Sequence, residues 1–216
     1  MKKRFFLLLF ALLLLPVNIK AEENTELIKN ATSGLLMEQS TGEIIFEKDK
    51  DKQVAVASMT KMVAQTIILE NIESGKIKWD DIVSVSKNAA DMGGSQIYLT
   101  AGEKMSVKDL FKGISMASAN DATVAMAEYI AGDEASFVKL MNDRAQELGC
   151  KNTNFKNSTG LDAENHYSTA YDMSLIAREL VKHKKILEFT STYEEYLRKD
   201  SSSPFWLVNT NKPVYK

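Results

Sequence analysis

The sequence has little of what a disulfide-rich or metal-dependent protein needs. It contains a single cysteine, Cys150, and two histidines among its 216 residues. One cysteine cannot form an internal disulfide, so the fold must be stabilised by an apolar core. No His-Glu-x-x-His motif and no cluster of ligating side chains occurs in the sequence. The sequence therefore predicts neither a metal ion nor an organic cofactor.

The sequence also lacks an excess of basic residues. Its 27 lysines and arginines are outnumbered by 29 aspartates and glutamates, which gives no indication of a nucleic-acid partner. Internal repeats and low-complexity tracts are absent beyond the N-terminal segment, and the only stretch rich in chain-breaking residues is Ser-Ser-Ser-Pro at 201–204. The length suits one apolar core or two small lobes.

Residues 1–21 have the pattern of a secretory signal peptide. A basic cluster at 2–4 precedes eleven apolar residues at 5–15, Pro16 follows them, and Ala21 is a small residue suited to cleavage. The apolar run is shorter than the about 20 residues that span a bilayer; retention as an N-terminal anchor is the alternative. Export would leave an acidic chain outside the cytoplasm, in the cell envelope or periplasm or at the outer face of the cytoplasmic membrane. No cysteine near the signal could carry a lipid.

Hydrophobic periodicity predicts a hairpin followed by a series of helices. Two short strands around a Ser-Thr-Gly turn fit residues 34–48, and a helix buried on more than one side fits 59–72. A short exposed strand is expected at 82–86 and a loop at 157–162. Further helices are predicted at 106–116, 121–130, 134–148 and 169–183. Because strands and helices are segregated in sequence, the predicted fold class is α+β.

Three Ser-x-x-Lys pairs could each place a hydroxyl beside an amine. On a helix, residues at this spacing share one face. A lysine can act as a base only when neutral, so its pKa must fall from about 10.4 to between about 7 and 8. Burial and the positive end of a helix dipole both lower it. The surroundings must therefore decide among the pairs, which are Ser58 with Lys61, Ser84 with Lys87 and Ser136 with Lys139.

Lys61 alone lies in a setting that favours a neutral amine. It is the single charge in V-A-V-A-S-M-T-K-M-V-A-Q-T-I-I-L at 54–69, and it falls in the first helical turn, where a capping box would place Glu. Lys139 shares its helix with several acids and Lys87 follows a strand-like segment, so both are predicted at the surface. Ser58 and Lys61 are the candidate nucleophile and base. The alternative is an N-cap serine with an outward-facing lysine.

A second segment, G-I-S-M-A-S-A-N-D-A-T-V-A-M-A at 113–127, also carries one charge. It places Ser118 and Asn120 at the junction of two predicted helices, where a hydroxyl could relay a proton and an amide could hold a peptide carbonyl. A Ser-x-Asn at 86–88 shows that the motif alone is weak, and a helix-capping loop is the alternative. His166 is alone in a loop and is interpreted as structural.

Together, A-S-M-T-K-M, S-A-N-D-A and N-S-T-G-L-D followed by H-Y-S-T-A-Y-D-M resemble the D-alanyl-D-alanine carboxypeptidases, the low-molecular-mass penicillin-binding proteins of peptidase family S11. The likeness runs from about residue 30 to the end and rests on the order, spacing and flanks of the motifs. It implies a β-lactamase/transpeptidase-like α+β fold with an antiparallel sheet, flanking helices and an all-helical lobe.

The resemblance implies a role for each matching residue. Ser58 would attack the carbonyl between two D-alanines at the end of a peptidoglycan stem peptide and form an acyl-enzyme, with Lys61 as its base. Ser118 would pass the proton to the leaving D-alanine, and Asn120 would bind substrate amides. The Ser58 N–H would be half of the oxyanion hole. β-Lactam antibiotics would be covalent inhibitors, and no metal or cofactor is implied.

The sequence departs from the family in lacking a Lys-Thr-Gly motif. In the family that motif lies on a strand shortly beyond the point where this chain stops, and the strand supplies the second oxyanion N–H. The family's C-terminal β domain and membrane-binding tail are also missing. Residues 22–216 are therefore expected to be a partial catalytic domain with an incomplete sheet and little carboxypeptidase activity.

Three other functions remain open from the sequence. A β-lactamase shares the scaffold, but the Glu-x-x-Leu-Asn pattern that often activates its deacylating water does not occur. A non-catalytic module that binds peptidoglycan or β-lactams is the second alternative. The third is a peptidase of another substrate range, such as an endopeptidase that cuts cross-links.

Overall fold

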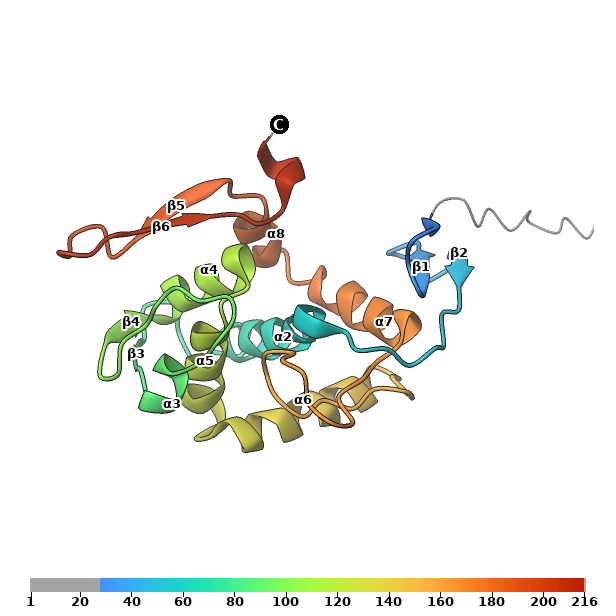
Figure 1. Cartoon of the computed structure of the whole chain (residues 1–216), viewed down its shortest axis with the longest axis horizontal. Helices are drawn as coiled ribbons and strands as arrows, with labels where there is room; N and C mark the ends of the chain where they lie inside the picture. Colours follow the sequence, from blue (N-terminus) through green and yellow to red (C-terminus); the bar gives the residue numbers. More distant parts are fainter. Residues whose placement is uncertain (1–27, 216) are drawn as a thin grey trace, which may run out of the picture. The chain divides into compact units, whose positions relative to one another are not determined.

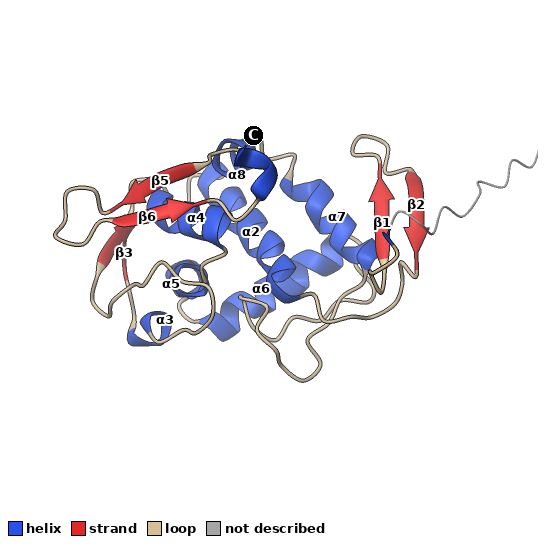
Figure 2. Cartoon of the chain, turned by 45° about the horizontal axis from the view of Figure 1, so that its top comes forward, coloured by secondary structure: helices blue, strands red, loops and turns tan. Residues whose placement is uncertain are grey.

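The computed structural model describes residues 28–215, and the predicted signal peptide lies outside this range. The chain divides into two units, residues 1–30 and 31–216, and every element below belongs to the second. In chain order (Figures 1 and 2) they are β1 (Gly34–Met37), β2 (Ile44–Lys48), η2 (Ala57–Thr60), α2 (Lys61–Glu73), β3 (Ile82–Ser84), α3 (Lys87–Ala90), β4 (Lys104–Ser106), α4 (Val107–Ala117), α5 (Asn120–Ala131), α6 (Glu134–Glu147), α7 (Ala170–Leu180), α8 (Lys185–Thr190), β5 (Glu194–Leu197), β6 (Phe205–Val208) and η3 (Lys212–Tyr215).

The described strands form three separate antiparallel pairs, β1 with β2, β3 with β4 and β5 with β6. The first is the predicted hairpin, and its turn contains Gly42 at φ 78°, which a glycine adopts without strain. The second joins segments separated by residues 85–103. In the third, the Ser-Ser-Ser-Pro stretch lies between the two strands. The sequence predicts an antiparallel sheet that is incomplete in this chain; within residues 28–215 the strands form antiparallel pairs and no larger sheet.

The predicted long helices all form, within one to three residues of the expected bounds. Two of them begin as the sequence indicates: Ser106 Oγ accepts from Asp109 N at 3.1 Å, and Thr169 Oγ1 accepts from Asp172 N at 3.0 Å. Each bond satisfies an N–H that the first turn would otherwise leave free. The helices α4 to α7 follow one another after the first two strand pairs, and the α+β class is confirmed.

Helix α2 lies at the centre of the helical part and contacts α4, α5, α6 and α7 (Figure 1). Its residues enter both apolar clusters of the core. Ile68 and Leu69 pack with α4 and α5, whereas Val63 and Ile67 pack with residues of α6 and α7. The helix is buried on several sides, as predicted, and the first turn is mostly buried among its neighbours.

None of the helices between residues 28 and 215 combines the length and the apolar character that crossing a bilayer needs.

Candidate active site

Ser58 lies in the short helix η2, which leads directly into α2. Its Oγ accepts a hydrogen bond from Lys61 Nζ at 3.1 Å, and Ser58 is exposed. No side-chain cap hydrogen bond occurs at the start of η2 or of α2, so Ser58 is not a simple N-cap. The preceding residue, Ala57, has φ 45°, a left-handed conformation that costs a non-glycine residue about 1–2 kcal/mol. Such strain persists where the surrounding contacts enforce it.

Lys61 is buried, with only 3% of its surface exposed. Its Nζ donates to Thr159 O at 2.7 Å and to Ser58 Oγ, and no carboxylate among residues 28–215 is recorded in an ion pair with it. Burial lowers the pKa of Lys61 from 10.5 to about 8, because the charged form loses its hydration without gaining a counter-ion. The amine can therefore be neutral near physiological pH and accept a proton from Ser58.

The loop of residues 157–162 supports this pair from the opposite side. Asn157 Oδ1 accepts from Gly160 N at 2.7 Å, and Ser158 is bonded to Glu134 through its N–H and its hydroxyl. Gly160 has φ 83°, and a Cβ built on it would lie 1.9 Å from Ala57 O. The backbone of the loop at Gly160 therefore packs directly against the backbone of Ala57, the residue that precedes Ser58.

His166 joins the same loop region to η2. Its Nε2 lies 2.9 Å from Thr60 Oγ1, and Lys156 N donates to its Nδ1 at 3.2 Å. Since Nδ1 accepts, Nε2–H donates to the threonine in the neutral imidazole. Burial lowers the pKa of His166, which keeps the ring neutral near pH 7. These contacts agree with the structural role predicted for it.

Ser118 and Asn120 lie at the junction of α4 and α5, as the sequence predicted. Ser118 ends α4 in a left-handed conformation, φ 57° and ψ 36°, and its buried Oγ has no hydrogen-bond partner within residues 28–215. Asn120 is buried, its N–H donates to Ser95 O at 2.7 Å, and its Nδ2 donates to Gly93 O at 2.7 Å. The hydrogen bond from Nδ2 to Gly93 O therefore fixes the orientation of the Asn120 side-chain amide.

Two observations relate this junction to helix α2 and to the loop of residues 157–162. Gln65, one turn after Lys61, donates to Ser115 Oγ on α4 at 3.2 Å. At Gly94, a built Cβ would lie 2.7 Å from Asn120 Nδ2 and 3.7 Å from Leu161 Cδ2. The loop that bears Thr159 and the loop that holds Asn120 thus meet at this point.

The other two Ser-x-x-Lys pairs are surface features, as predicted. Lys139 pairs with Asp143 at 3.1 Å and its side chain is 78% exposed. Lys87 pairs with Asp91 and is likewise exposed; it begins α3, whereas Ser84 ends β3. The second Ser-x-Asn is a helix cap, because Ser86 Oγ accepts from Ala89 N at 2.9 Å.

A cavity of about 400 Å³ adjoins the residues that precede Ser58. It is lined on one side by Val56 and Ala57 and on the other by the segment 160–164 and His166. The acidic side chains at its rim are Asp162 and Glu164, both exposed. The hollow is open to solvent and lies next to the nucleophile candidate along the chain.

One cluster could in principle hold a cation, away from these residues. Ligand atoms of Glu70, Glu179 and His183 lie within 4.8 Å of one another. Arg144 already pairs with both carboxylates, at 2.6 Å and 3.1 Å, and Lys182 pairs with Glu179 at 2.6 Å. We therefore interpret the cluster as an ion-pair network between helices.

Sequence reasoning did not find Thr159, Gly93 or Ser95, whose backbone carbonyls hold Lys61 and Asn120. Every residue type has a backbone carbonyl, so the residue types in a sequence do not show which carbonyls make such contacts. The glycines at 94 and 160 are the signal that was available, since a backbone approached this closely admits no side chain.

The fold and the motifs together define the class to which the chain belongs. A model of the D-alanyl-D-alanine carboxypeptidase family, peptidase S11, matches residues 19–216. The chain is 52% identical over 193 residues to D-alanyl-D-alanine carboxypeptidase DacF of Bacillus subtilis, covering 89% of this chain and 50% of the relative. It is 38% identical over 183 residues to DacC of Escherichia coli, covering 82% and 45%.

Solved structures agree with these matches. Penicillin-binding protein 5 of Haemophilus influenzae has a TM-score of 0.80 and 32% identity, over 86% of this chain and 54% of that one. DacD of Francisella tularensis has a TM-score of 0.74 and 38% identity, over 76% and 40%. The chain belongs to the D-alanyl-D-alanine carboxypeptidase family, peptidase S11. It spans about half the length of the curated relatives that it matches.

Proposed function

We propose that the protein is a serine-type D-alanyl-D-alanine carboxypeptidase, exported from the cytoplasm, that trims peptidoglycan stem peptides. The observation that carries this proposal is the buried Lys61, whose amine has no carboxylate among the described residues and donates to the Ser58 hydroxyl. A lysine with a pKa of about 8 beside an exposed serine is suited to nucleophilic catalysis. The names of the relatives supply the substrate class.

In the proposed acylation, Ser58 Oγ attacks the carbonyl carbon between the two D-alanines while its proton passes to Lys61 Nζ. The carbon–nitrogen bond to the terminal D-alanine then breaks, and the leaving amine receives a proton through Ser118. Water completes the cycle by hydrolysing the ester. The buried Ser118 Oγ, which has no partner within the described residues, has its hydrogen-bonding capacity available for this transfer.

Asn120 would hold the substrate. Because its Nδ2 donates to Gly93 O, its Oδ1 remains the amide's acceptor and can receive an N–H of the stem peptide. The Ser58 N–H would stabilise the oxyanion that forms in the transition state. A β-lactam, whose strained amide takes the place of the D-alanyl-D-alanine bond, would acylate the same serine and act as a covalent inhibitor.

Labelling with a fluorescent penicillin tests the proposal. The protein should be labelled in equal molar amount, and Ser58→Ala should abolish labelling. Ser136→Ala is the matched control, because Ser136 belongs to a Ser-x-x-Lys pair at the surface, and it should be labelled like the wild type. Release of D-alanine from a stem pentapeptide then tests the carboxypeptidase reaction. Labelling that survives Ser58→Ala would refute the assignment, and rapid turnover of the penicillin would favour a β-lactamase.

A further inference from the structure

The loop of residues 93–99 connects the Asn120 region to the rest of the fold. On its inner side, Gly93 O and Ser95 O accept from Asn120. The carboxylate of the next residue, Asp121, accepts from Ile97 N at 3.2 Å and from Leu99 N at 2.9 Å. Asp121 is completely buried, so these bonds satisfy a carboxylate that would otherwise be costly to bury. The loop is therefore bonded along its length to the start of α5.

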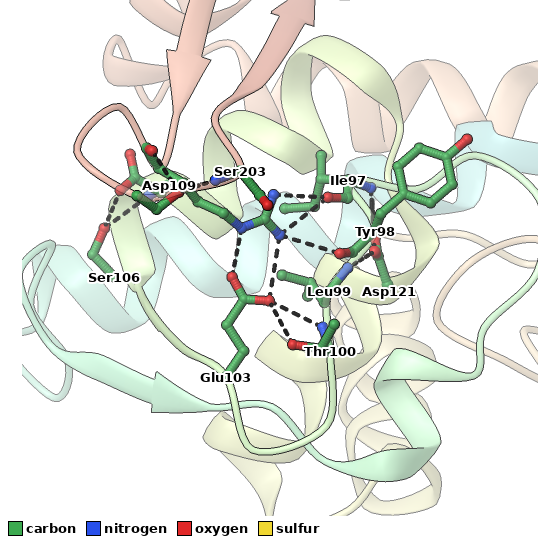
Figure 3. A network of polar contacts seen from close by, with 11 residues as sticks. Ile97, Tyr98, Leu99, Thr100, Glu103, Ser106, Asp109, Asp121 and Ser203 are labelled. Atoms are coloured by element: carbon green, nitrogen blue, oxygen red, sulfur yellow. Dashed lines mark hydrogen bonds and ion pairs between the residues drawn. The ribbon is translucent and has the colours of Figure 1, made fainter.

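The 93–99 loop is also held by Arg198, which directly follows β5. Figure 3 shows Ile97, Tyr98 and Leu99 of this loop together with Glu103 and Asp121. Arg198 Nη1 and Nη2 each donate to Ile97 O at 3.1 Å, and Nη2 also lies 3.3 Å from Tyr98 O. The same guanidinium pairs with Glu103 Oε1 at 2.5 Å. The two peptide groups that flank Ile97 are therefore held from both sides. The Asp121 carboxylate accepts from the Ile97 N–H, and Arg198 donates to the Ile97 carbonyl.

The arrangement is held against local strain. Tyr98 and Arg198 both have left-handed backbones, φ 57° and 56°, a conformation that is unfavourable for residues other than glycine. Burial alone would raise the pKa of Glu103, but hydrogen bonds from Arg198 and from Thr100 N outweigh it and the pKa is lowered. A strained backbone together with a partly buried ion pair indicates that many contacts determine one loop conformation.

We propose that Arg198 is a positioning residue for Asn120. By holding Ile97 O, it fixes the 93–99 loop so that Gly93 O keeps the Asn120 amide oriented with Oδ1 available to substrate. The inference rests on the proposed substrate-binding role of Asn120. It assigns to the β5–β6 hairpin, which carries none of the four candidate residues, a part in building the site.

The chain contains a matched control for this arginine. Arg178 on α7 also clamps two backbone carbonyls, with Nε donating to Gln39 O at 2.7 Å and Nη2 to Ser40 O at 2.8 Å. These carbonyls belong to the β1–β2 turn and make no recorded contact with Asn120 or its loop. Arg178→Ala therefore removes a similar clamp without touching the candidate site.

The first experiment measures the loop itself and needs no enzymatic activity. Amide exchange at Ile97 and Leu99, followed by NMR, should be about tenfold faster in Arg198→Ala, since hydrogen bonds from a charged donor are lost. The side-chain amide signals of Asn120 should move, and Arg178→Ala should change neither. If Arg198→Ala does not fold, Arg198→Lys replaces it in the experiment. The lysine keeps a positive charge beside Glu103, but its single ammonium group cannot bond Glu103 and both carbonyls at once. Unchanged exchange and unchanged Asn120 signals in a folded Arg198 variant would overturn the inference.

The second experiment is a double-mutant cycle on the rate of penicillin acylation. Arg198→Ala should slow acylation about tenfold in a protein with Asn120, and by much less when Asn120 is already alanine. Arg178→Ala and Asn120→Ala should be additive. Equal slowing by Arg198→Ala with and without the Asn120 side chain would mean that the arginine acts elsewhere and would overturn the inference. If the wild type is not acylated at all, the proposed function fails, and the exchange experiment alone decides on Arg198.

Discussion

At the scale of single residues, Lys61 breaks two rules of stable folding. It places a cation in the first turn of a helix, where the dipole disfavours it, and it buries that cation with no ion-pair partner among the described residues. A fall in its pKa from 10.5 to about 8 corresponds to a penalty of about 3 kcal/mol for the charged form. The hydrogen bonds from Lys61 to Thr159 O and Ser58 Oγ offset this cost only in part, because the pKa stays lowered. A site that needs a neutral amine would retain such a cost.

The rate of acylation should therefore depend on pH through Lys61. Because its folded-state pKa is lowered to about 8, the amine is mostly protonated below that pH and mostly neutral above it. Acylation by a penicillin should rise through pH 8 and then level off. Lys61→Arg, which stays charged at every accessible pH, should lower the acylation rate at least about 100-fold.

The control for this prediction is Lys139→Arg, a change at an exposed lysine of the same motif spacing, which should leave the profile unaltered. A rate that is constant between pH 6 and pH 9, or substantial acylation of Lys61→Arg, would contradict the role of Lys61 as the base.

At the scale of elements, the loop of residues 157–162 and the helix η2 are built against each other. Gly160 approaches Ala57 O so closely that a Cβ would lie 1.9 Å from it, and Thr159 O accepts from Lys61. The position of Ser58 therefore depends on a loop about 100 residues further along the chain.

Gly160→Ala should lower the free energy of unfolding by about 3 kcal/mol or more and reduce penicillin labelling, because the new methyl group must push η2 away. The control is Gly75→Ala. Gly75 has φ 73° but open space around its Cβ position, so only the backbone strain of about 1–2 kcal/mol is expected. Urea denaturation measures the free energy of unfolding of both variants. Equal decreases in Gly160→Ala and Gly75→Ala would show that the contact with η2 contributes nothing to stability.

The helices that the sequence predicted are those with long, regular patterns. The helices α2, α4, α5, α6 and α7 repeat apolar residues over three or more turns, and three of them, α4, α6 and α7, have a side chain that caps the first turn. The sequence patterns do not predict the strands β4, β5 and β6 or the short helices α3, α8 and η3. β4 has three residues and β5 contains Glu194 and Glu195, so neither has a strand pattern long enough to stand out.

The same distinction applies within the candidate site. The contact between Ser58 and Lys61 follows from the spacing of three residues on a helix. The carbonyls that hold Lys61 and Asn120 come from distant loops, and Arg198 lies in no motif. Contacts of this kind depend on which distant segments the fold brings together, and a single sequence does not show this.

At the scale of the whole described unit, Arg144 joins three helices. From α6 it pairs with Glu70 on α2 at 2.6 Å and with Glu179 on α7 at 3.1 Å. Its side chain is 22% exposed, so its ion pairs are less screened by solvent than those at the open surface. The network lies on the side of α2 that faces the second apolar cluster.

Arg144→Met should lower the free energy of unfolding by about 1–3 kcal/mol, because it leaves two partly buried carboxylates without their shared partner. Lys139→Met, which breaks an exposed pair on the same helix, should change it by less than about 0.5 kcal/mol. Urea denaturation at low and high salt distinguishes the two. Equal effects, or a loss for Arg144→Met that vanishes in salt, would show that the network acts only as surface charge.

The central position of α2 has a consequence for how the sequence can vary. Its neighbours surround it, so nearly every position from Lys61 to Leu69 is buried, whereas α6, of similar length, buries only Phe137, Met141 and Ala145. In a saturation library scored for folded protein, α2 should accept few replacements and α6 many. Between two helices of one domain, the freedom to drift during evolution should therefore differ severalfold, and the segment that bears the candidate base should be among the slowest to change.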